Sequence, residues 1–183
     1  MSHKSLKVRF ETELGVIDVE LFTDKAPLSC QSFIQFLEDG RFKDGGFNRV
    51  VRPDNDAGNP KISVIQGGVL EANSIGKENC VPHETTEQSG IKHTDGTLSL
   101  ARLQPGTGSG GVFFICLGEQ PGLDFGAERY KDRQGFAAFG RVVQGMNVVK
   151  EIHQIRDVFE TTDHYPDGQI LKSPVRILEA HLL

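Results

Sequence analysis

The stretch Gly45–Gly68 reads GGFNRVVRPDNDAGNPKISVIQGG. Two short apolar runs flank a loop, residues 52–60, that is rich in the turn-forming residues Pro, Asn, Asp and Gly. Each run predicts a strand, and each carries one polar side chain that differs from its neighbours, Arg49 in the first and Gln66 in the second. We expect the two strands to be neighbours, with Arg49 and Gln66 on one shared surface where the protein acts.

Most of the remaining chain carries strand patterns. Apolar and polar residues alternate over 6–11 and again over 17–21, which predicts a hairpin with its turn at 12–15. Further strands are predicted at 97–101, at 112–117 (apolar throughout, so buried on both faces), at 136–143 and at 175–182. We expect the third of these to be broken at Gly140 and the last to bulge at Leu178, where its alternation slips.

Two segments show the spacing of three and four residues that places apolar side chains on one face of a helix. The first begins at Pro27, which suits a first helical position, and ends before Gly40. The second has its apolar residues at Val148, Val149, Ile152 and Ile155. Strands and helices do not alternate, which disfavours a parallel sheet. The pattern predicts a mainly β protein, an antiparallel barrel or sandwich with two helices over its open ends and polar loops at 71–95, 119–134 and 157–168.

The chain has 183 residues, a net charge of −5 and three cysteines. This length suits a single domain, 1–183, whose core needs no disulfide or metal. The acidic balance argues against a protein that binds nucleic acid or anionic membranes, because such a protein needs a basic surface. Three cysteines without a CxxC spacing argue against a disulfide framework and a zinc site, so we expect a cytoplasmic protein. The first ten residues hold no long apolar run, so we expect neither a signal peptide nor a membrane span.

Several motifs that could carry chemistry are incomplete. The Gly-rich loop 106–111 lacks the Lys-Ser/Thr of a P-loop and precedes a strand, so we expect a close backbone approach beside a groove and no nucleotide site. Segment 54–59 has oxygen ligands but no Glu at the twelfth position of a calcium loop. The histidines lack metal-binding spacing, no GxSxG elbow is present, and Cys116 lies in an apolar run. We therefore expect no metal and no cofactor.

Arg49 has two interpretations. An arginine on an apolar strand can extend its head group to the surface or pair with an acid, and periodicity alone favours that structural role. The functional interpretation needs further residues in other parts of the chain.

Those residues are present, and together they resemble one family. The matching blocks are Phe47-Asn-Arg-Val, Val64-Ile-Gln-Gly-Gly, Lys92-His-Thr-Asp-Gly, Leu98-Ser-Leu-Ala, Phe113-Phe-Ile, Phe139-Gly-Arg-Val and Gly145-Met. In this order they are similar to the cyclophilin-type peptidyl-prolyl cis-trans isomerases, in a divergent, bacterial-like form. The resemblance spans nearly the whole chain and implies a closed eight-stranded antiparallel barrel capped by two α-helices.

The resemblance also implies roles for single residues. Arg49 occupies the position of the family's catalytic arginine. Gln66 matches a glutamine that binds the substrate backbone, and Phe114 matches a phenylalanine in the floor of the proline pocket. The other substrate-binding positions that we assign are Phe47, Ala101, Arg102, Leu123 and Phe136, the last of which stands where the family has a histidine.

The chain departs from the family pattern at several of these sites. Asn48 stands where the family usually has His, Ser63 where it has a large apolar residue in the pocket wall, and Val112 where it has Gln. Gly122 replaces the usual Trp, and the chain contains no Trp at all. We expect a pocket that is wider, or one rebuilt by Phe136 or by the insertion within 119–134.

The resemblance implies an enzyme of the EC 5.2.1.8 type that assists protein folding by rotating X–Pro bonds in proline-containing peptides and in unfolded or folding proteins. It needs no cofactor, and we expect a monomer that binds cyclosporin weakly or not at all, because the family's Trp contacts that drug. The alternative is a catalytically weak module of the same fold that binds proline peptides. Arg49 and Phe114 favour the enzyme, whereas Ser63, Val112 and Gly122 leave room for the module.

Overall fold

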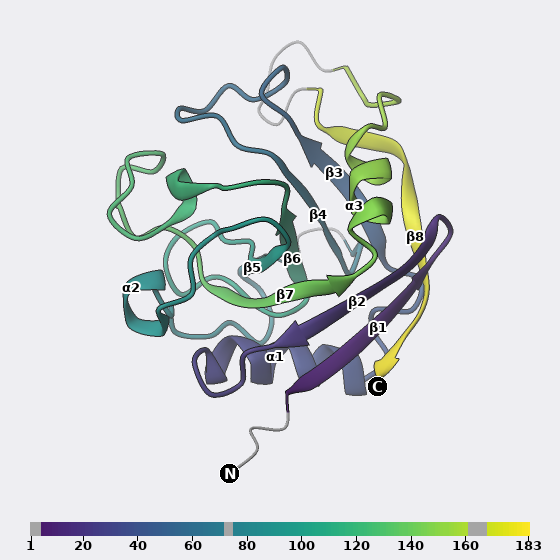
Figure 1. Ribbon diagram of the computed structural model, residues 1–183, viewed down its shortest axis with the longest axis horizontal. Coiled ribbons are helices and arrows are strands. Elements are labelled where there is room, and N and C mark those ends of the chain that lie inside the picture. The colour runs from purple at the N-terminus through teal and green to yellow at the C-terminus, as the bar shows by residue number, and fades with distance from the viewer. Residues whose placement is uncertain (1–4, 72–74, 161–167) are drawn as a thin grey trace.

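Eight antiparallel strands form a closed barrel in the computed structural model, which describes residues 5–71, 75–160 and 168–183 (Figure 1). The strands follow one another around the barrel in the order β1-β2-β7-β5-β6-β4-β3-β8. They are β1 (Leu6–Thr12), β2 (Gly15–Leu21), β3 (Gly46–Val51), β4 (Val64–Gly68), β5 (Thr97–Leu100), β6 (Val112–Cys116), β7 (Ala138–Gln144) and β8 (Ile170–Leu182). The predicted mainly β fold, a closed eight-stranded antiparallel barrel, is confirmed.

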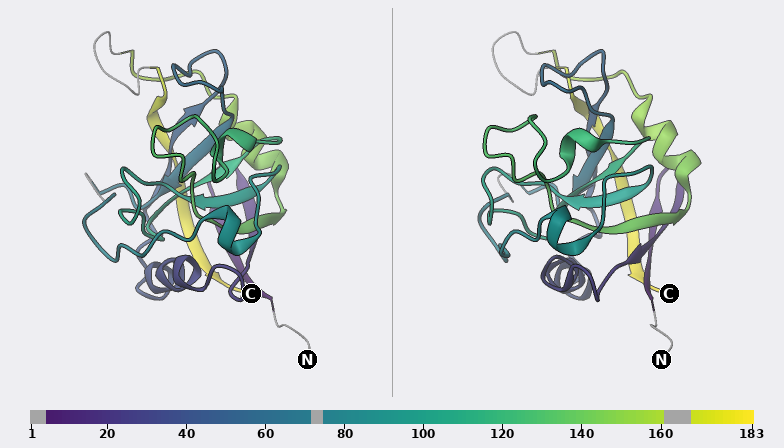
Figure 2. Two further views of the ribbon diagram at one scale, coloured as in Figure 1. Left: turned by 90° about the vertical axis from the view of Figure 1, so that its left-hand side faces the viewer. Right: turned by 60° about the vertical axis from the view of Figure 1, so that its left-hand side comes forward.

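The two predicted helices are α1 (Pro27–Glu38) and α3 (Met146–His153). Figure 2 shows α1 across one end of the barrel, where it contacts β7 and β8. α3 contacts β2, β3 and β4, which lie on opposite sides of the barrel, so it covers the other opening. Ile155, predicted to belong to the second helix, lies just beyond its end. The sequence interpretation missed a one-turn helix, α2 (Thr86–Ser89), inside the predicted loop at 71–95.

Phenylalanines from the strands, from α1 and from the turn after it fill the barrel. Phe10, Phe33, Phe42 and Phe113 lie within 5.0–6.0 Å of one another by ring centroids, and each is at most 1% exposed. The strand β6 is buried along its whole length, as its continuous apolar run predicted. The barrel interior is therefore filled by apolar side chains.

Two local predictions about the strands can be compared with the backbone. A bulge does occur at Leu178, because Glu11 pairs with Glu179 whereas Thr12 pairs with Ile177. Gly140 does not break its strand; it pairs with Leu21 and Leu98, and a side chain there would lie 2.6 Å from the carbonyl oxygen of Glu20.

The Gly-rich loop makes its close approach to α1 instead of beside the pocket. A Cβ atom on Gly110 would lie 2.1 Å from the backbone nitrogen of Phe33, and one on Gly111 would lie 2.7 Å from the ring of Phe36. The predicted polar loop at 157–168 falls mostly on residues 161–167, which lie outside the described part of the chain.

Candidate active site

Strand pairing places Arg49, Gln66 and Phe114 in one row. Arg49 on β3 is directly opposite Gln66 on β4, and Gln66 is directly opposite Phe114 on β6. Residues opposite each other on paired strands have side chains on the same face of the sheet, so the three side chains meet on one surface. The expectation that Arg49 and Gln66 share a surface is confirmed.

Three hydrogen bonds to amide oxygens hold the Arg49 guanidinium. Its Nε and Nη2 donate to Gln169 Oε1 at 2.9 and 2.8 Å, and its Nη1 donates to Gln66 Oε1 at 3.2 Å. Gln169 is fully buried, and its own Nε2 donates to the carbonyl of Asn55 at 2.9 Å. The guanidinium is therefore oriented by neutral amides that are themselves held in place. Gln169 was not found from the sequence, because it directly precedes β8 and reaches β3 through a backbone bond to Val50.

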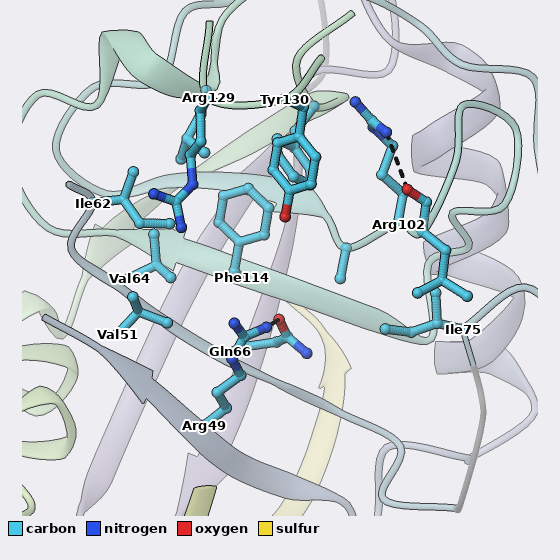
Figure 3. Close-up of a pocket in the computed structure, with 14 residues that line it drawn as sticks. Arg49, Val51, Ile62, Val64, Gln66, Ile75, Arg102, Phe114, Arg129 and Tyr130 are labelled. Atoms are coloured by element: carbon cyan, nitrogen blue, oxygen red, sulfur yellow. Dashed lines mark hydrogen bonds between the residues drawn. The ribbon is translucent and has the colours of Figure 1, made fainter. Parts of the chain in front are cut away.

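These side chains border a cavity of about 290 Å³ (Figure 3). It is lined by seven of the eight predicted site residues: Arg49, Gln66, Ala101, Arg102, Phe114, Leu123 and Phe136. It is also lined by seven residues to which no individual role was assigned from the sequence: Val51, Ile62, Val64, Ile75, Leu103, Arg129 and Tyr130. The lining is mostly apolar with a few convergent polar groups, as is common for binding sites.

Phe47 is the predicted site residue that does not line this cavity. It is fully buried in the barrel core, with its ring perpendicular to that of Phe113 at 6.0 Å. The cause is a bulge at Asn48, since Phe47 pairs with Gly67 whereas Arg49 pairs with Gln66. The extra residue turns Phe47 and Arg49 to opposite faces of the sheet. We therefore withdraw Phe47 as a substrate-binding residue.

Arg129 attaches the inserted loop, residues 119–134, to the loop at 52–60. Its Nη1 and Nη2 each donate to one carboxylate oxygen of Asp56 at 2.9 Å, and its Nη1 also donates to the carbonyl of Pro60 at 2.7 Å. Both side chains are buried, at 4% and 0% exposure. Burial by itself would raise the pKa of Asp56, but hydrogen bonds from Arg129 and from the backbone of Gly58 and Ile62 outweigh it and lower that pKa.

Arg102 makes a second attachment on the other side of Tyr130. It donates to both carboxylate oxygens of Asp132 at 2.9 and 3.0 Å and to the carbonyl of Gly135 at 2.8 Å. Its guanidinium carbon also lies 5.4 Å from the ring centre of Tyr130 and 4.9 Å from that of Phe136. The inserted loop is thus fixed to the barrel by charge-assisted hydrogen bonds and a cation–π contact.

A buried polar group supports the floor of the pocket. The His93 ring stacks on Phe114 at 6.0 Å, its Nδ1 donates to Asp124 at 2.8 Å, and its Nε2 accepts from the Ser99 hydroxyl at 2.9 Å. These are the residue types of a hydrolase triad, but Ser99 is 0% and His93 1% exposed. A substrate cannot reach the Ser99 hydroxyl, so the group supports Phe114 and supplies no nucleophile. Burial lowers the pKa of His93, against the opposing effect of Asp124.

Other chemistry finds little support in the described part of the chain. No group of three or more His, Cys, Asp or Glu side chains there could hold a metal ion. Cys30 and Cys116 are buried, and burial raises the pKa of the Cys30 thiol to about 12 and that of Cys116 even further, so neither forms a thiolate readily. Among the described residues, no helix has the length and apolar character needed to cross a bilayer.

The family model for the cyclophilin type peptidyl-prolyl cis-trans isomerase/CLD matches residues 7–182. The chain belongs to this family. Its reaction is the cis-trans isomerisation of X–Pro peptide bonds, and related enzymes occur in bacteria and eukaryotes. A peptidyl-prolyl cis-trans isomerase of Acinetobacter baylyi is 29% identical over 175 residues, which cover 96% of this chain and 84% of the relative. Peptidyl-prolyl cis-trans isomerase B of Escherichia coli is 32% identical over 79% of this chain and 82% of its own length.

Solved structures agree with this cyclophilin fold. A cyclophilin type peptidyl-prolyl cis-trans isomerase of Cryptosporidium parvum superposes with a TM-score of 0.73 at 18% identity, covering 98% of both chains. A second crystal structure of that protein, obtained in the presence of the dipeptide Ala-Pro, gives a TM-score of 0.72.

The departures from the cyclophilin pattern now have positions in space. Ser63 is not part of the pocket lining; Ile62 and Val64, on either side of it, form that wall. Gly122 lies against the loop at 52–60, where a Cβ atom would be 2.5 Å from the Pro60 ring. Arg129 and Tyr130 come from the inserted loop, so this cyclophilin completes its pocket partly with the insertion, which was one of the alternatives expected from the sequence.

Proposed function

We propose that Arg49 is the catalytic residue of this isomerase and that the pocket beside it holds the substrate proline. The observation that carries the proposal is the row Arg49–Gln66–Phe114, which sets an oriented guanidinium beside an aromatic floor. Phe114 would pack against the proline ring. Gln66 uses its amide oxygen to orient Arg49, and its amide N–H₂ group is the donor that we assign to a substrate carbonyl.

The reaction needs a donor at the proline nitrogen. An X–Pro bond rotates slowly because its C–N bond has partial double-bond character, with a barrier of about 18–20 kcal/mol. In the twisted transition state the nitrogen becomes pyramidal and regains its lone pair. A guanidinium aimed at that lone pair binds the twisted state better than either planar isomer, and this difference in binding lowers the barrier. Arginine remains charged at every cellular pH, so the donor is always available.

The remaining assigned residues would enclose the substrate. Ala101, Arg102, Leu123 and Phe136 line the same cavity as Arg49, and each is at most 7% exposed. Their role is to exclude water, which strengthens the hydrogen bond from Arg49. Arg102 would act mainly by holding Tyr130 and Phe136, because its charge is already matched by Asp132.

The test compares wild type with Arg49→Ala in an isomerisation assay on an X-Pro peptide. A charged hydrogen bond contributes about 1.5–3 kcal/mol, so kcat/KM should fall by about one to two orders of magnitude. Arg49→Lys keeps the charge but loses the planar fork, and should recover only part of the rate. Arg141→Ala is the matched control, since Arg141 lies on β7 with an exposed side chain paired to Glu20.

The same assay separates the enzyme from the alternative of a catalytically weak binding module. If wild type and Arg49→Ala both isomerise the peptide at the uncatalysed rate, Arg49 is not catalytic and the module is the better description. Peptide binding measured by calorimetry would then persist in both proteins.

We also propose the setting in which the enzyme works. Its substrates would be proline-containing segments of unfolded or folding proteins, in line with the Ala-Pro dipeptide used with the Cryptosporidium relative. The strands in the described part of the chain close into a barrel without a free sheet edge, which supports a monomer built as one domain over 1–183. Free thiols at Cys30, Cys80 and Cys116 support a reducing, cytoplasmic location. Sedimentation as a dimer would contradict the monomer.

A further inference from the structure

A second hollow adjoins the proline pocket on the side of the inserted loop. It has a volume of about 280 Å³ and is lined by Ala57, Gly58, Arg129 and Tyr130. Arg129 and Tyr130 line the proline pocket as well. A peptide that places its proline beside Arg49 can therefore continue past Tyr130 into this hollow.

Tyr130 is built into the wall between the two spaces. Its ring lies perpendicular to that of Phe136 at 5.3 Å, and Phe136 lies perpendicular to Phe114 at the same distance. The three rings thus run from the pocket floor to the inserted loop. Figure 3 shows the Tyr130 ring extending over the pocket, with its hydroxyl toward the side of Gln66.

Ion pairs hold the chain in place both before and after Tyr130. Arg129, just before Tyr130, is fixed to Asp56, and Asp132, two residues after it, is fixed to Arg102. The backbone carbonyl of Tyr130 also accepts from the nitrogen of Arg133 at 3.0 Å. A loop attached at these points can present one aromatic surface in a constant position, which is what selectivity between substrates requires.

The hollow suits an aromatic or large apolar side chain. Ala57 and Gly58 leave space opposite Tyr130, and a Cβ atom on Gly58 would lie 2.2 Å from Nη1 of Arg129, so a larger residue there would displace the guanidinium. The charge of Arg129 is matched by the buried carboxylate of Asp56, which removes the electrostatic reason to bind an acidic residue. An aromatic ring that enters the hollow can stack on Tyr130.

We propose that Tyr130 is a specificity-determining residue, which selects an aromatic or large apolar side chain at one position flanking the substrate proline. This inference rests on the proposed function of the Arg49 pocket. It adds a subsite made by the inserted loop and the loop at 52–60.

The experiment measures kcat/KM on two peptide series in which the residue before or after the proline is Phe, Leu, Glu or Gly. Wild type should prefer Phe and Leu over Gly by about three- to tenfold in one of the series. Tyr130→Ala should lower the ratio of kcat/KM on the Phe and Gly peptides to about one, on top of any loss that all the peptides share because Tyr130 also lines the proline pocket. Tyr130→Phe should keep the preference, because it keeps the ring.

Phe125→Ala is the matched control. Phe125 is an aromatic residue of the same inserted loop, 37% exposed, that lines neither hollow. An equal loss on every peptide in Tyr130→Ala, an unchanged preference, or a wild-type preference for Glu would each overturn the proposal. Failure of the underlying function looks different: it would show as no difference between wild type and Arg49→Ala on any peptide.

Discussion

Phe113 and Phe114 are consecutive on β6, yet they belong to two aromatic groups with different surroundings. Phe113 faces the barrel interior, where its neighbours within 6.0 Å are the rings of Phe10, Phe33, Phe42 and Phe47. Strand alternation sends Phe114 to the opposite face, where its ring neighbours are His93 and Phe136. One group is apolar on all sides, whereas the other is backed by polar residues.

The core rings and the pocket rings are held in place by different kinds of contact, and this difference lets a cyclophilin pocket present an aromatic surface to a ligand. The core rings are positioned by close packing in every direction. The pocket rings border the cavity, and directional contacts help to fix them: His93 supports Phe114, and Arg102 supports Tyr130 and Phe136. Hydrogen bonds and cation–π contacts thus replace part of the packing that an open pocket gives up.

The largest difference should appear when the two phenylalanines are truncated. Phe113→Ala leaves a cavity inside the core and should lower the free energy of unfolding by about 3–5 kcal/mol. Phe114→Ala opens into an existing pocket, so it should cost less stability but raise KM for X-Pro peptides. Urea unfolding and isomerisation kinetics measure both quantities. Equal losses of stability would contradict the distinction between the two groups.

The next-largest loss of stability should follow when the contact that holds the inserted loop is removed. Asp56→Asn removes the buried carboxylate that holds Arg129, and should lower the free energy of unfolding by about 1.5–3 kcal/mol and weaken peptide binding. Asp44→Asn serves as control: its side chain is 77% exposed, and its loss should change stability by less than about 0.5 kcal/mol. Similar effects in both variants would show that the Arg129 contact does not hold the wall.

A smaller effect should appear as a pH dependence of stability. Burial lowers the pKa values of His93 and His153 below the ordinary value of 6.5, so the unfolded chain takes up protons first as the pH falls. Stability should be complete above pH 6.5 and decline below it, by at most about 1.4 kcal/mol per pH unit for each histidine. The lowered pKa of Asp56 adds a further decline nearer pH 4.

Unfolding measured at several pH values, in wild type and in His93→Gln, checks this origin. The variant should lose part of the slope between pH 6.5 and 5, with His153 supplying the remainder. An unchanged slope would exclude His93 as a source.

The smallest expected signal is cyclosporin binding. Gly122 stands where other cyclophilins have the Trp that contacts the drug, and its backbone packs on Pro60. We expect weak binding or none in calorimetric titration, and no recovery in Gly122→Trp, because the new side chain would collide with the Pro60 ring. Tight binding by the wild type would show that another part of the pocket replaces the missing aromatic group.

Local sequence patterns were sufficient to predict most of the strands and the two longer helices. Strand alternation, helix spacing and turn residues are set by neighbours in the chain, so the hairpin at the N-terminus, α1, α3 and the bulge at Leu178 could be predicted. The ordered blocks added the family, and with it Arg49, Gln66 and Phe114. A four-residue helix such as α2 carries too few positions for a period to appear, so it was missed.

The completed pocket depends on contacts that no local pattern encodes. A bulge at Asn48 turns the Phe47 side chain to the face of the sheet opposite that of Arg49. Closure of the barrel brings Gln169, which is 120 positions away in sequence, into contact with Arg49. Tyr130 enters the wall only because ion pairs on both sides of it draw the inserted loop onto the barrel. Local periodicity was enough for the strands and helices, and the order of the matching blocks added the closed barrel and the candidate residues Arg49, Gln66 and Phe114. The pocket walls could not be read from the chain, because loops are positioned by long-range partners.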